Sequence, residues 1–202
     1  MIPVPFFLFF LPFFLLLFAV ANSNLCFDNK DELDAAVYQY TIEEDCATNS
    51  QCKIGQTYGW PINSWCISNV TDMSNLFKDR TSFNEDISSW DVSSVTNMRG
   101  MFRYASSFNG NIGSWNVSNV ADMQSMFWDA SSFNGDIFSW DVSNINNMYR
   151  MFSRASSFNG DIGSWNVSSV IYMYGMFRGA SSFNGDIGSW DLSDVNDMEG
   201  MF

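Results

Sequence analysis

The chain has 202 residues, a formal net charge of −13 and no histidine. This acidic balance argues against DNA or RNA as a partner, since phosphate binding requires a basic surface. It also disfavours adsorption to an anionic membrane. Without histidine, and with serines that only recur with a repeat, we predict neither an enzyme nor a cofactor.

Residues 1–21 form an apolar run without a charged side chain, interrupted by three prolines. The run ends with small residues at Ala19 and Ala21, as a signal-peptidase site requires. We therefore predict a signal peptide that is cleaved after Ala21. An uncleaved anchor is the alternative, because about 20 apolar residues can span a bilayer.

The four cysteines all lie on the N-terminal side of the chain, at Cys26, Cys46, Cys52 and Cys66. An even number in an exported protein predicts two disulfides. Of the possible pairings, we favour Cys26–Cys46 with Cys52–Cys66, since each closes a local loop. A zinc site is the alternative, but the close C-x-x-C pairs of such sites are missing.

Residues 22–59 lie before the repeats and are predicted to form an N-terminal cap, with a binding head as the alternative. The run at 26–46 predicts one helix, capped by Asp28 or Asn29 and acidic in its first turn. Three apolar residues share one face of this helix: Leu33, Val37 and Tyr40.

Residues 60–202 consist of about five and a half copies of a 25-residue repeat. Tryptophan recurs at 65, 90, 115, 140, 165 and 190, each 25 residues after the last. An unbroken period of this length predicts a solenoid, in which each rung buries its apolar face against its neighbours. The chain stops in mid-repeat at Phe202, which we interpret as a truncated gene model or a fragment.

Each rung is expected to contain a strand and a helical segment. Trp115 and Val117 alternate with polar residues, which indicates a short strand with both side chains inward. Ser118 can cap the next element, and residues 120–127 carry an apolar stripe at helical or 3-10 spacing. The Asn-Gly-Asp sequence at 134–136 then turns the chain.

The repeat W-[DN]-V-S-x-V-x-x-M-x-x-M-F-x-x-A-S-S-F-N-G-D-I resembles that of the BspA-like leucine-rich-repeat surface proteins, over residues 60–202. The resemblance implies an α/β repeat solenoid, a right-handed leucine-rich-repeat-like superhelix with one parallel sheet and short helical or 3-10 segments. With the N-terminal region, we expect a helical, disulfide-stapled cap. It also implies a secreted or cell-surface protein that acts by adhesion, and it brings no catalytic residues. The first rung departs from the pattern at Cys66, Ile67, Leu76 and Arg80, as expected for a rung that meets the cap.

Three apolar or amide ladders follow the repeat. The methionine and phenylalanine ladders, typified by Met123, Met126 and Phe127, are predicted to pack in the core, with copper binding as the alternative. The asparagine ladder is predicted to be buried and to bond the backbone across rungs. Its members are Asn84, Asn109, Asn134, Asn159 and Asn184.

The residue after each tryptophan forms an outward row: Cys66, Asp91, Asn116, Asp141, Asn166 and Asp191. Rungs about 4.8 Å apart would bring adjacent aspartates into direct repulsion. Alternation with asparagine separates the charges by about 10 Å, one Debye length. Calcium binding by this row, or by Asp136, Asp161 and Asp186, is the alternative. The row also holds glycosylation sequons at Asn116 and Asn166, and Asn69 begins a third.

Basic and variable aromatic residues gather in or after the predicted helical segment. Arginine with tyrosine and tryptophan is the composition of protein interfaces, so we predict a binding face here, with an ordinary solvated face as the alternative. Its residues are Arg99, Arg103, Tyr104, Trp128, Tyr149, Arg150, Arg154, Tyr172, Tyr174 and Arg178.

The sequence thus predicts a secreted or cell-surface repeat scaffold that mediates adhesion or binds a protein or glycan, without catalysis. No nucleic acid partner and no membrane insertion of the mature repeats are expected. Attachment to a cell surface would come from a region beyond Phe202. The alternative is a structural extracellular protein that binds a wall, ice, mineral or calcium through its regular polar ladders.

Overall fold

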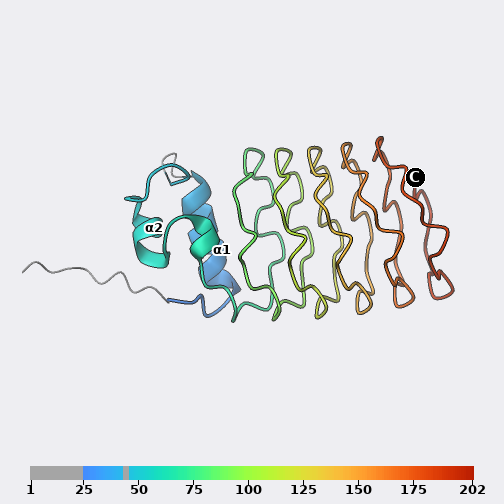
Figure 1. The fold of residues 1–202 in the computed structure, drawn as a ribbon, viewed down its shortest axis with the longest axis horizontal. Helices are drawn as coiled ribbons and strands as arrows, with labels where there is room; N and C mark the ends of the chain where they lie inside the picture. The colour runs from blue at the N-terminus through green and yellow to red at the C-terminus, as the bar shows by residue number, and fades with distance from the viewer. Residues whose placement is uncertain (1–24, 43–45) are drawn as a thin grey trace, which may run out of the picture.

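The computed structural model describes residues 25–42 and 46–202, which form two unlike parts (Figure 1). The first part is helical and contains α1 (Lys30–Ile42), α2 (Lys53–Tyr58) and the 3-10 helix η1 (Ile62–Ser64). In the second part, rungs of the chain stack side by side up to Phe202 (Figure 1). The predicted signal peptide at 1–21 lies outside the described residues.

The predicted amphipathic helix is present as α1, which is shorter than the run that suggested it. Asn29 rather than Asp28 caps it, because the Asn29 Oδ1 accepts a hydrogen bond of 3.1 Å from the backbone nitrogen of Glu32. Acidic residues occupy the first turn, where their negative charge stabilises the helix by interacting with the positive end of its dipole. The buried face consists of Leu33, Ala36, Val37 and Tyr40.

The predicted parallel sheet, and with it the leucine-rich-repeat-like α/β fold class, is wrong. In the described part of the chain there is no strand, and no helix follows η1. Between the described rungs, parallel pairing is limited to isolated bridges at one position of each rung, such as Asp72 with Asn97 and Asn97 with Asp122. The rungs are instead built from consecutive turns.

Local turns explain why the Trp-x-Val segment forms no strand. The backbone nitrogen of Trp115 donates to the carbonyl of Ile112 at 3.1 Å, and that of Val120 donates to Val117 at 2.9 Å. A sheet ladder needs such groups for the neighbouring strand. The tryptophan side chain makes the bond between rungs here, because the Trp115 Nε1 donates to the Ile87 carbonyl at 3.2 Å.

Left-handed residues explain why the Met-x-x-Met-Phe segment forms no helix. Overlapping turns run from Met98 to Ala105, each closed by a bond from a backbone nitrogen to the carbonyl three residues earlier. Gly100 and Tyr104 both have a φ of 62°. An α-helix requires a φ of about −63° at every residue. A left-handed residue at these two places therefore stops the predicted helical segment.

Backbone amides between the turns join one rung to the next. The backbone nitrogen of Met98 donates to the carbonyl of Asp122 at 2.9 Å, and that of Gly100 donates to Gln124 at 2.8 Å. The same register recurs along the stack. Neighbouring rungs are thus tied at alternate residues of the turns, which satisfies buried backbone groups without a sheet.

The predicted core packing of the methionine and phenylalanine ladders is confirmed. Phe102 lies 3.8 Å from Phe108 within a rung and 5.6 Å from Phe127 on the next, measured between ring centres. Fully buried methionines recur with the period at Met98, Met123, Met148 and Met173. Equivalent side chains thus stack on one another along the length of the molecule.

The asparagine ladder makes the predicted bonds but is not buried. The Asn84 Oδ1 accepts from the backbone nitrogen of Asn109 at 2.8 Å, and the Asn109 Oδ1 accepts from Asn134 at the same distance. The side chains of all five asparagines are exposed. The Asn-Gly-Asp segment at 134–136 does not form the predicted turn, because it lies between turns at 131–132 and 138–139. Bonding across rungs was correctly predicted, and burial was wrong.

The cysteines form the disulfides Cys26–Cys66 and Cys46–Cys52, so the predicted pairing is wrong. Cys26 pairs in parallel with Cys66, and the backbone nitrogen of Phe27 donates to the Cys66 carbonyl at 2.9 Å. The segment before α1 therefore lies alongside the first rung. This contact between distant parts of the chain overrides the nearness in sequence on which the predicted pairing relied.

Candidate binding surface

The predicted basic and aromatic residues lie on the turn segments, which are residues 97–105 and their equivalents every 25 residues. Within the first of these, Met101 and Phe102 are buried, whereas Arg99 is exposed and Arg103 and Tyr104 are half-buried. Left-handed turns separate inward methionine and phenylalanine from outward polar residues. Each rung thus presents its variable side chains on one side of the stack.

Arg103 is held by aromatic rings from two rungs. Its Cζ lies 4.0 Å from the ring centre of Trp128 and 4.8 Å from that of Tyr104. Its Nη2 also donates a hydrogen bond of 3.1 Å to the Tyr104 hydroxyl. A guanidinium over an aromatic face is attracted by the ring's negative face. These contacts fix the orientation of Arg103.

Arg150 extends the same arrangement over further rungs. Its Cζ lies 5.0 Å from the ring centre of Trp128, 5.2 Å from Tyr149 and 5.3 Å from Tyr174. The rings of Tyr149 and Tyr174 stack with centres 5.2 Å apart. We call this set of contacts the cation–π ladder. Its members are Arg103, Tyr104, Trp128, Tyr149, Arg150 and Tyr174.

The positive charges of the ladder are not neutralised within the described part of the chain. The ion pairs among the described residues are Lys30–Asp34, Lys78–Asp79 and Arg154–Asp129. None of them involves Arg103 or Arg150. The Nε atoms of Arg103 and Arg150 and the Nε1 of Trp128 are buried without a hydrogen-bond partner. Leaving a buried donor unsatisfied costs about 1–3 kcal/mol. The ladder is therefore partly desolvated and cationic, on a chain whose net charge is −13.

A small cavity of about 110 Å³ adjoins the ladder and is lined by Trp128, Arg150, Ser153, Arg154 and Arg178. Ser153 is buried, and its hydroxyl donates to the Arg178 carbonyl at 3.2 Å. Three arginines thus line one cavity. Arg154 is paired with an acidic side chain, since its Nη1 lies 3.7 Å from the Asp129 Oδ2.

Three residues of the predicted face have left-handed backbones: Tyr104, Arg150 and Arg154, with φ of 62°, 54° and 59°. The equivalent places in other rungs hold glycine, asparagine, aspartate or serine, at Gly100, Gly175, Gly179, Gly200, Asn75, Asp79, Asp129 and Ser125. The left-handed region costs a residue with a Cβ about 1–2 kcal/mol. Bulky residues are thus kept where glycine is sterically better, and such strain clusters at functional sites.

Two residues of the predicted face lie outside the ladder and the cavity. Arg99 and Tyr172 are exposed and sit on the same turn segments. In the described ranges neither of them makes a ring contact or an ion pair. The structure therefore brings together eight of the ten predicted residues and leaves these two apart.

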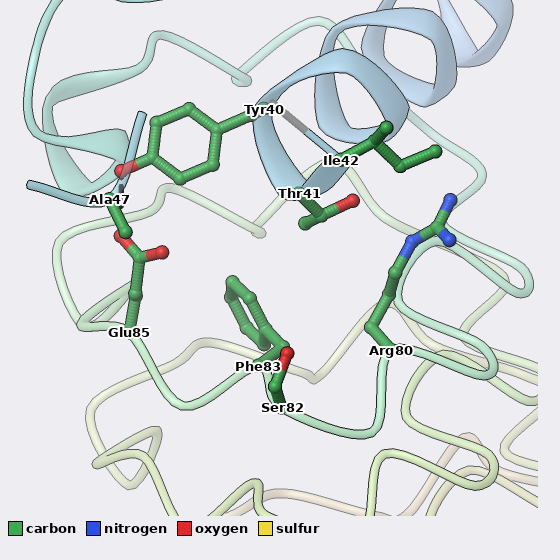
Figure 2. Close-up of a pocket in the computed structure, with 8 residues that line it drawn as sticks. All are labelled: Tyr40, Thr41, Ile42, Ala47, Arg80, Ser82, Phe83 and Glu85. Carbon is green, nitrogen blue, oxygen red and sulfur yellow. Dashed lines mark hydrogen bonds between the residues drawn. The ribbon is translucent and has the colours of Figure 1, made fainter. Parts of the chain in front are cut away.

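A larger cavity that sequence reasoning missed lies between α1 and the first rung (Figure 2). It measures about 310 Å³, and the Tyr40 hydroxyl donates to the Glu85 Oε2 at 2.6 Å. Burial raises the pKa of Glu85, and burial together with this bond raises the pKa of Tyr40. The signal in the sequence was Glu85 itself, which replaces the glycine found at Gly110 in the next rung.

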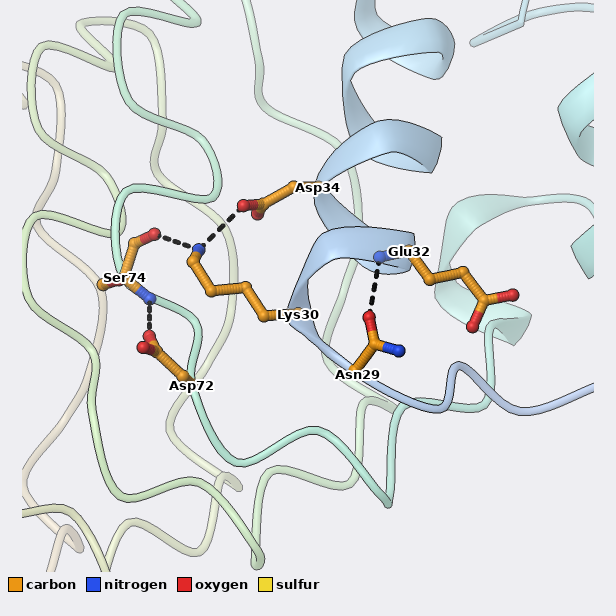
Figure 3. A network of polar contacts seen from close by, with 6 residues as sticks. All are labelled: Asn29, Lys30, Glu32, Asp34, Asp72 and Ser74. Carbon is orange, nitrogen blue, oxygen red and sulfur yellow. Dashed lines mark hydrogen bonds and ion pairs between the residues drawn. The ribbon is translucent and has the colours of Figure 1, made fainter.

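Arg80 lines the same cavity, and its Cζ lies 5.2 Å from the ring centre of Tyr38 on α1. It stands where the next rung has Ala105. A second contact is shown in Figure 3: the Lys30 Nζ donates to the Ser74 carbonyl and lies 2.9 Å from the Asp34 Oδ2. These contacts hold α1 against the first rung. We therefore interpret this region as the structural contact between the helical part and the stack.

The row after each tryptophan is exposed at Asp91, Asn116, Asp141, Asn166 and Asp191. Within each rung, a serine hydroxyl bonds to this residue; for example, the Ser93 Oγ donates to the Asp91 Oδ1 at 2.6 Å. Such bonds lower the pKa of the three aspartates.

The sequon asparagines Asn69, Asn116 and Asn166 are all exposed. Across residues 25–42 and 46–202, no cluster of three or more histidine, cysteine, aspartate or glutamate residues is arranged to hold a metal ion. In the same ranges, no helix is both long enough and apolar enough to cross a membrane.

The structure thus defines a repeat protein made of stacked turns, with a disulfide-linked helical part at one end. A family model described as "Mycoplasma protein of unknown function, DUF285" matches residues 48–149 and 135–202. Because these matches cover more than half of the chain, the protein belongs to this family. No curated protein and no solved structure matches it.

Proposed function

We propose that the chain is an extracellular, non-catalytic repeat scaffold that binds a protein or glycan at a cell surface. Its two disulfides support an oxidising compartment, because such bonds persist outside the reducing cytosol. Its repeat resembles that of the BspA-like surface proteins, for which adhesion is the expected role.

The cation–π ladder is the observation that carries this proposal. Arginine, tryptophan and tyrosine dominate the binding energy of protein interfaces. In the ladder they are held by one another, as in the contacts of Arg103 with Trp128 and of Tyr149 with Tyr174. A surface that is ordered before binding loses less side-chain entropy when the partner arrives.

The chemistry of the ladder supports binding rather than catalysis. Arginine stays protonated in proteins and cannot serve as a general base. Asp129, the carboxylate that pairs with an arginine of the cavity, is in contact with Arg154. A cationic, aromatic surface of this kind recognises groups by charge and stacking.

The test compares a variant of the ladder with a variant of the polar row after each tryptophan. The triple change Arg103→Ala, Tyr149→Ala and Tyr174→Ala removes contacts of the ladder. The control, Asp91→Asn, Asp141→Asn and Asp191→Asn, copies the asparagines that already occur in that row. Binding to panels of cell-surface ectodomains and glycans is measured by interferometry on immobilised protein. The proposal expects binding that the first variant loses and the control keeps.

The second candidate is a structural extracellular protein that uses its regular polar ladders. The exposed row after each tryptophan favours it, because the same bond from a serine hydroxyl recurs at Asp91, Asn116, Asp141 and Asn166. The same pair of variants separates the candidates. Loss of binding in the aspartate variant alone, or binding only to ice, mineral or wall polymers, would favour the structural role.

A further inference from the structure

We propose that the cavity at Trp128, Arg150, Ser153, Arg154 and Arg178 binds carboxylate side chains of an acidic peptide segment in a protein partner. This inference rests on the proposed function and specifies the chemistry of its surface. The cavity and the cation–π ladder together are called the carboxylate site below.

Unneutralised charge is the first argument. Three arginines line a cavity of about 110 Å³. Among the described residues, Arg154 forms an ion pair with Asp129, whereas Arg150 and Arg178 form none. The Arg154–Asp129 contact is 3.7 Å long, and the Arg154 side chain is 70% exposed, so it is weak. Arg150 and Arg178 keep their full charge toward a ligand.

Orientation is the second argument. Rings of Trp128, Tyr149 and Tyr174 surround the Arg150 guanidinium at 5.0–5.3 Å. Its Nε is buried without a partner, which leaves the terminal nitrogens as its donors to a ligand. A planar guanidinium fits a carboxylate with two parallel hydrogen bonds. The ring contacts therefore present Arg150 in a form that requires little rearrangement to bind a carboxylate.

Backbone strain is the third argument. Arg150 and Arg154 occupy left-handed positions with φ of 54° and 59°, whereas the next rung has Gly175 and Gly179 at the same places. Glycine at position 150 or 154 would fit the left-handed turn without strain. The chain nevertheless has an arginine at both places. The strain is explained if both guanidinium groups are required at the cavity.

The distribution of the cations favours a peptide as the occupant. Arg150 and Arg154 belong to one rung, and Arg178 belongs to the next. A peptide segment with several carboxylates can contact the arginines of both rungs at once, whereas a single small anion can contact only those nearest to it. Arginine clusters are a recurring means of recognising acidic motifs.

The test uses a fluorescent octaglutamate peptide, with octaglutamine as the uncharged control, titrated against the full chain at low salt. The active variant is Arg150→Gly with Arg154→Gly, which removes two charges and keeps a residue suited to the left-handed turn. The control variant, Arg99→Gln with Lys53→Gln, removes the same net charge from exposed residues outside the site. Circular dichroism confirms that both variants are folded.

We expect octaglutamate to bind, octaglutamine not to bind, and the active variant to weaken binding at least about tenfold. The control variant should stay within about twofold, because scattered surface charges act weakly at a distance. Equal loss in both variants would overturn the site in favour of a general charge effect, and no binding of octaglutamate would overturn it outright. A hyaluronan oligosaccharide that binds more tightly with the same arginine dependence would overturn the peptide as occupant. In each of these cases the scaffold proposal is still tested separately by the ectodomain and glycan panels.

Discussion

The guanidinium carbon of Arg103 lies 4.0 Å from the ring centre of Trp128, and these two residues are 25 positions apart in the sequence. They occupy the same place on neighbouring rungs. The contact is therefore a direct product of the repeat, which brings equivalent positions together. It begins a row of alternating cations and rings that continues to Tyr174.

Replacing Trp128 by leucine should destabilise the stack by about 1 kcal/mol, because the loss of the partly desolvated ring contacts with Arg103 and Arg150 outweighs the removal of an indole donor that has no partner. Urea unfolding followed by circular dichroism measures the change. The control is Tyr172→Leu, an exposed aromatic outside the ladder, which should change the free energy of unfolding by less than about 0.5 kcal/mol. Equal effects would mean that Trp128 is an ordinary surface residue.

Replacing Arg154 by glycine should stabilise the protein by about 1 kcal/mol. The residue has a φ of 59° and an exposed side chain, so the change relieves backbone strain and removes little else. The reciprocal change, Gly179→Ala at the same place on the next rung, should destabilise by about the same amount. The Cβ it adds would lie 3.5 Å from Arg154, an ordinary contact. A loss of stability in the arginine variant would show that its side chain contributes more than its backbone costs.

Removing the disulfide Cys26–Cys66 with a double alanine variant should cost more stability than removing Cys46–Cys52. The first closes a separation of 40 residues and the second a separation of 6. Loop-closure entropy then predicts losses of about 4 and about 2 kcal/mol. Urea unfolding of the two variants checks this order. The reverse order would indicate that the unfolded chain keeps the N-terminal part close to the first rung without the bond.

Glu85→Gln should change how stability depends on pH. Burial raises the pKa of Glu85 above its ordinary value of 4.5, so above the raised pKa the charged carboxylate destabilises the folded state. As the pH falls through that pKa, the folded protein binds the proton first and gains stability relative to the variant. The variant, whose amide oxygen can still accept from Tyr40, should be the more stable at neutral pH.

At a pH well below 4.5, the ordinary pKa of Glu85, this difference in stability between the native protein and the Glu85→Gln variant should disappear. The carboxyl group is then neutral in both the folded and the unfolded state. Thermal unfolding at a series of pH values measures the difference, and a gap that stays constant with pH would contradict the account. The aspartates Asp91 and Asp141 act in the opposite direction, since their pKa values are lowered and they lose stabilisation in acid. Both proteins share these aspartates, so they cancel in the comparison.

The repeat and helix α1 could be predicted because their periods stand out in the sequence. The conformation of the rungs could not, because alternation at Trp115 and Val117 looks the same in a strand and in consecutive turns. A signal was present in Gly100, Gly175 and Gly200, which recur at one place of the repeat. Ser125 and Arg150 at that same place concealed it.

The residues of the cation–π ladder stood out in the sequence by their composition, whereas their grouping depended on contacts between rungs. The pairs Arg103–Trp128 and Tyr149–Tyr174 are each 25 residues apart and followed from the period alone. The contact of Trp128 with Arg150 spans 22 residues, and it depends on side-chain directions that the sequence does not specify. The same holds for Tyr40 and Glu85, which belong to different parts of the fold.

The most direct test of the carboxylate site is an NMR titration of the tryptophan indole N–H groups with octaglutamate. The chain has eight tryptophans, and Trp128 is the one in the described ranges whose indole nitrogen is buried without a hydrogen-bond partner. The others donate to backbone carbonyls, as Trp140 does to Ile112 at 3.1 Å. We predict that the Trp128 signal shifts on titration while the core tryptophan signals stay in place. A Trp128 signal that does not move at saturating peptide would contradict the account.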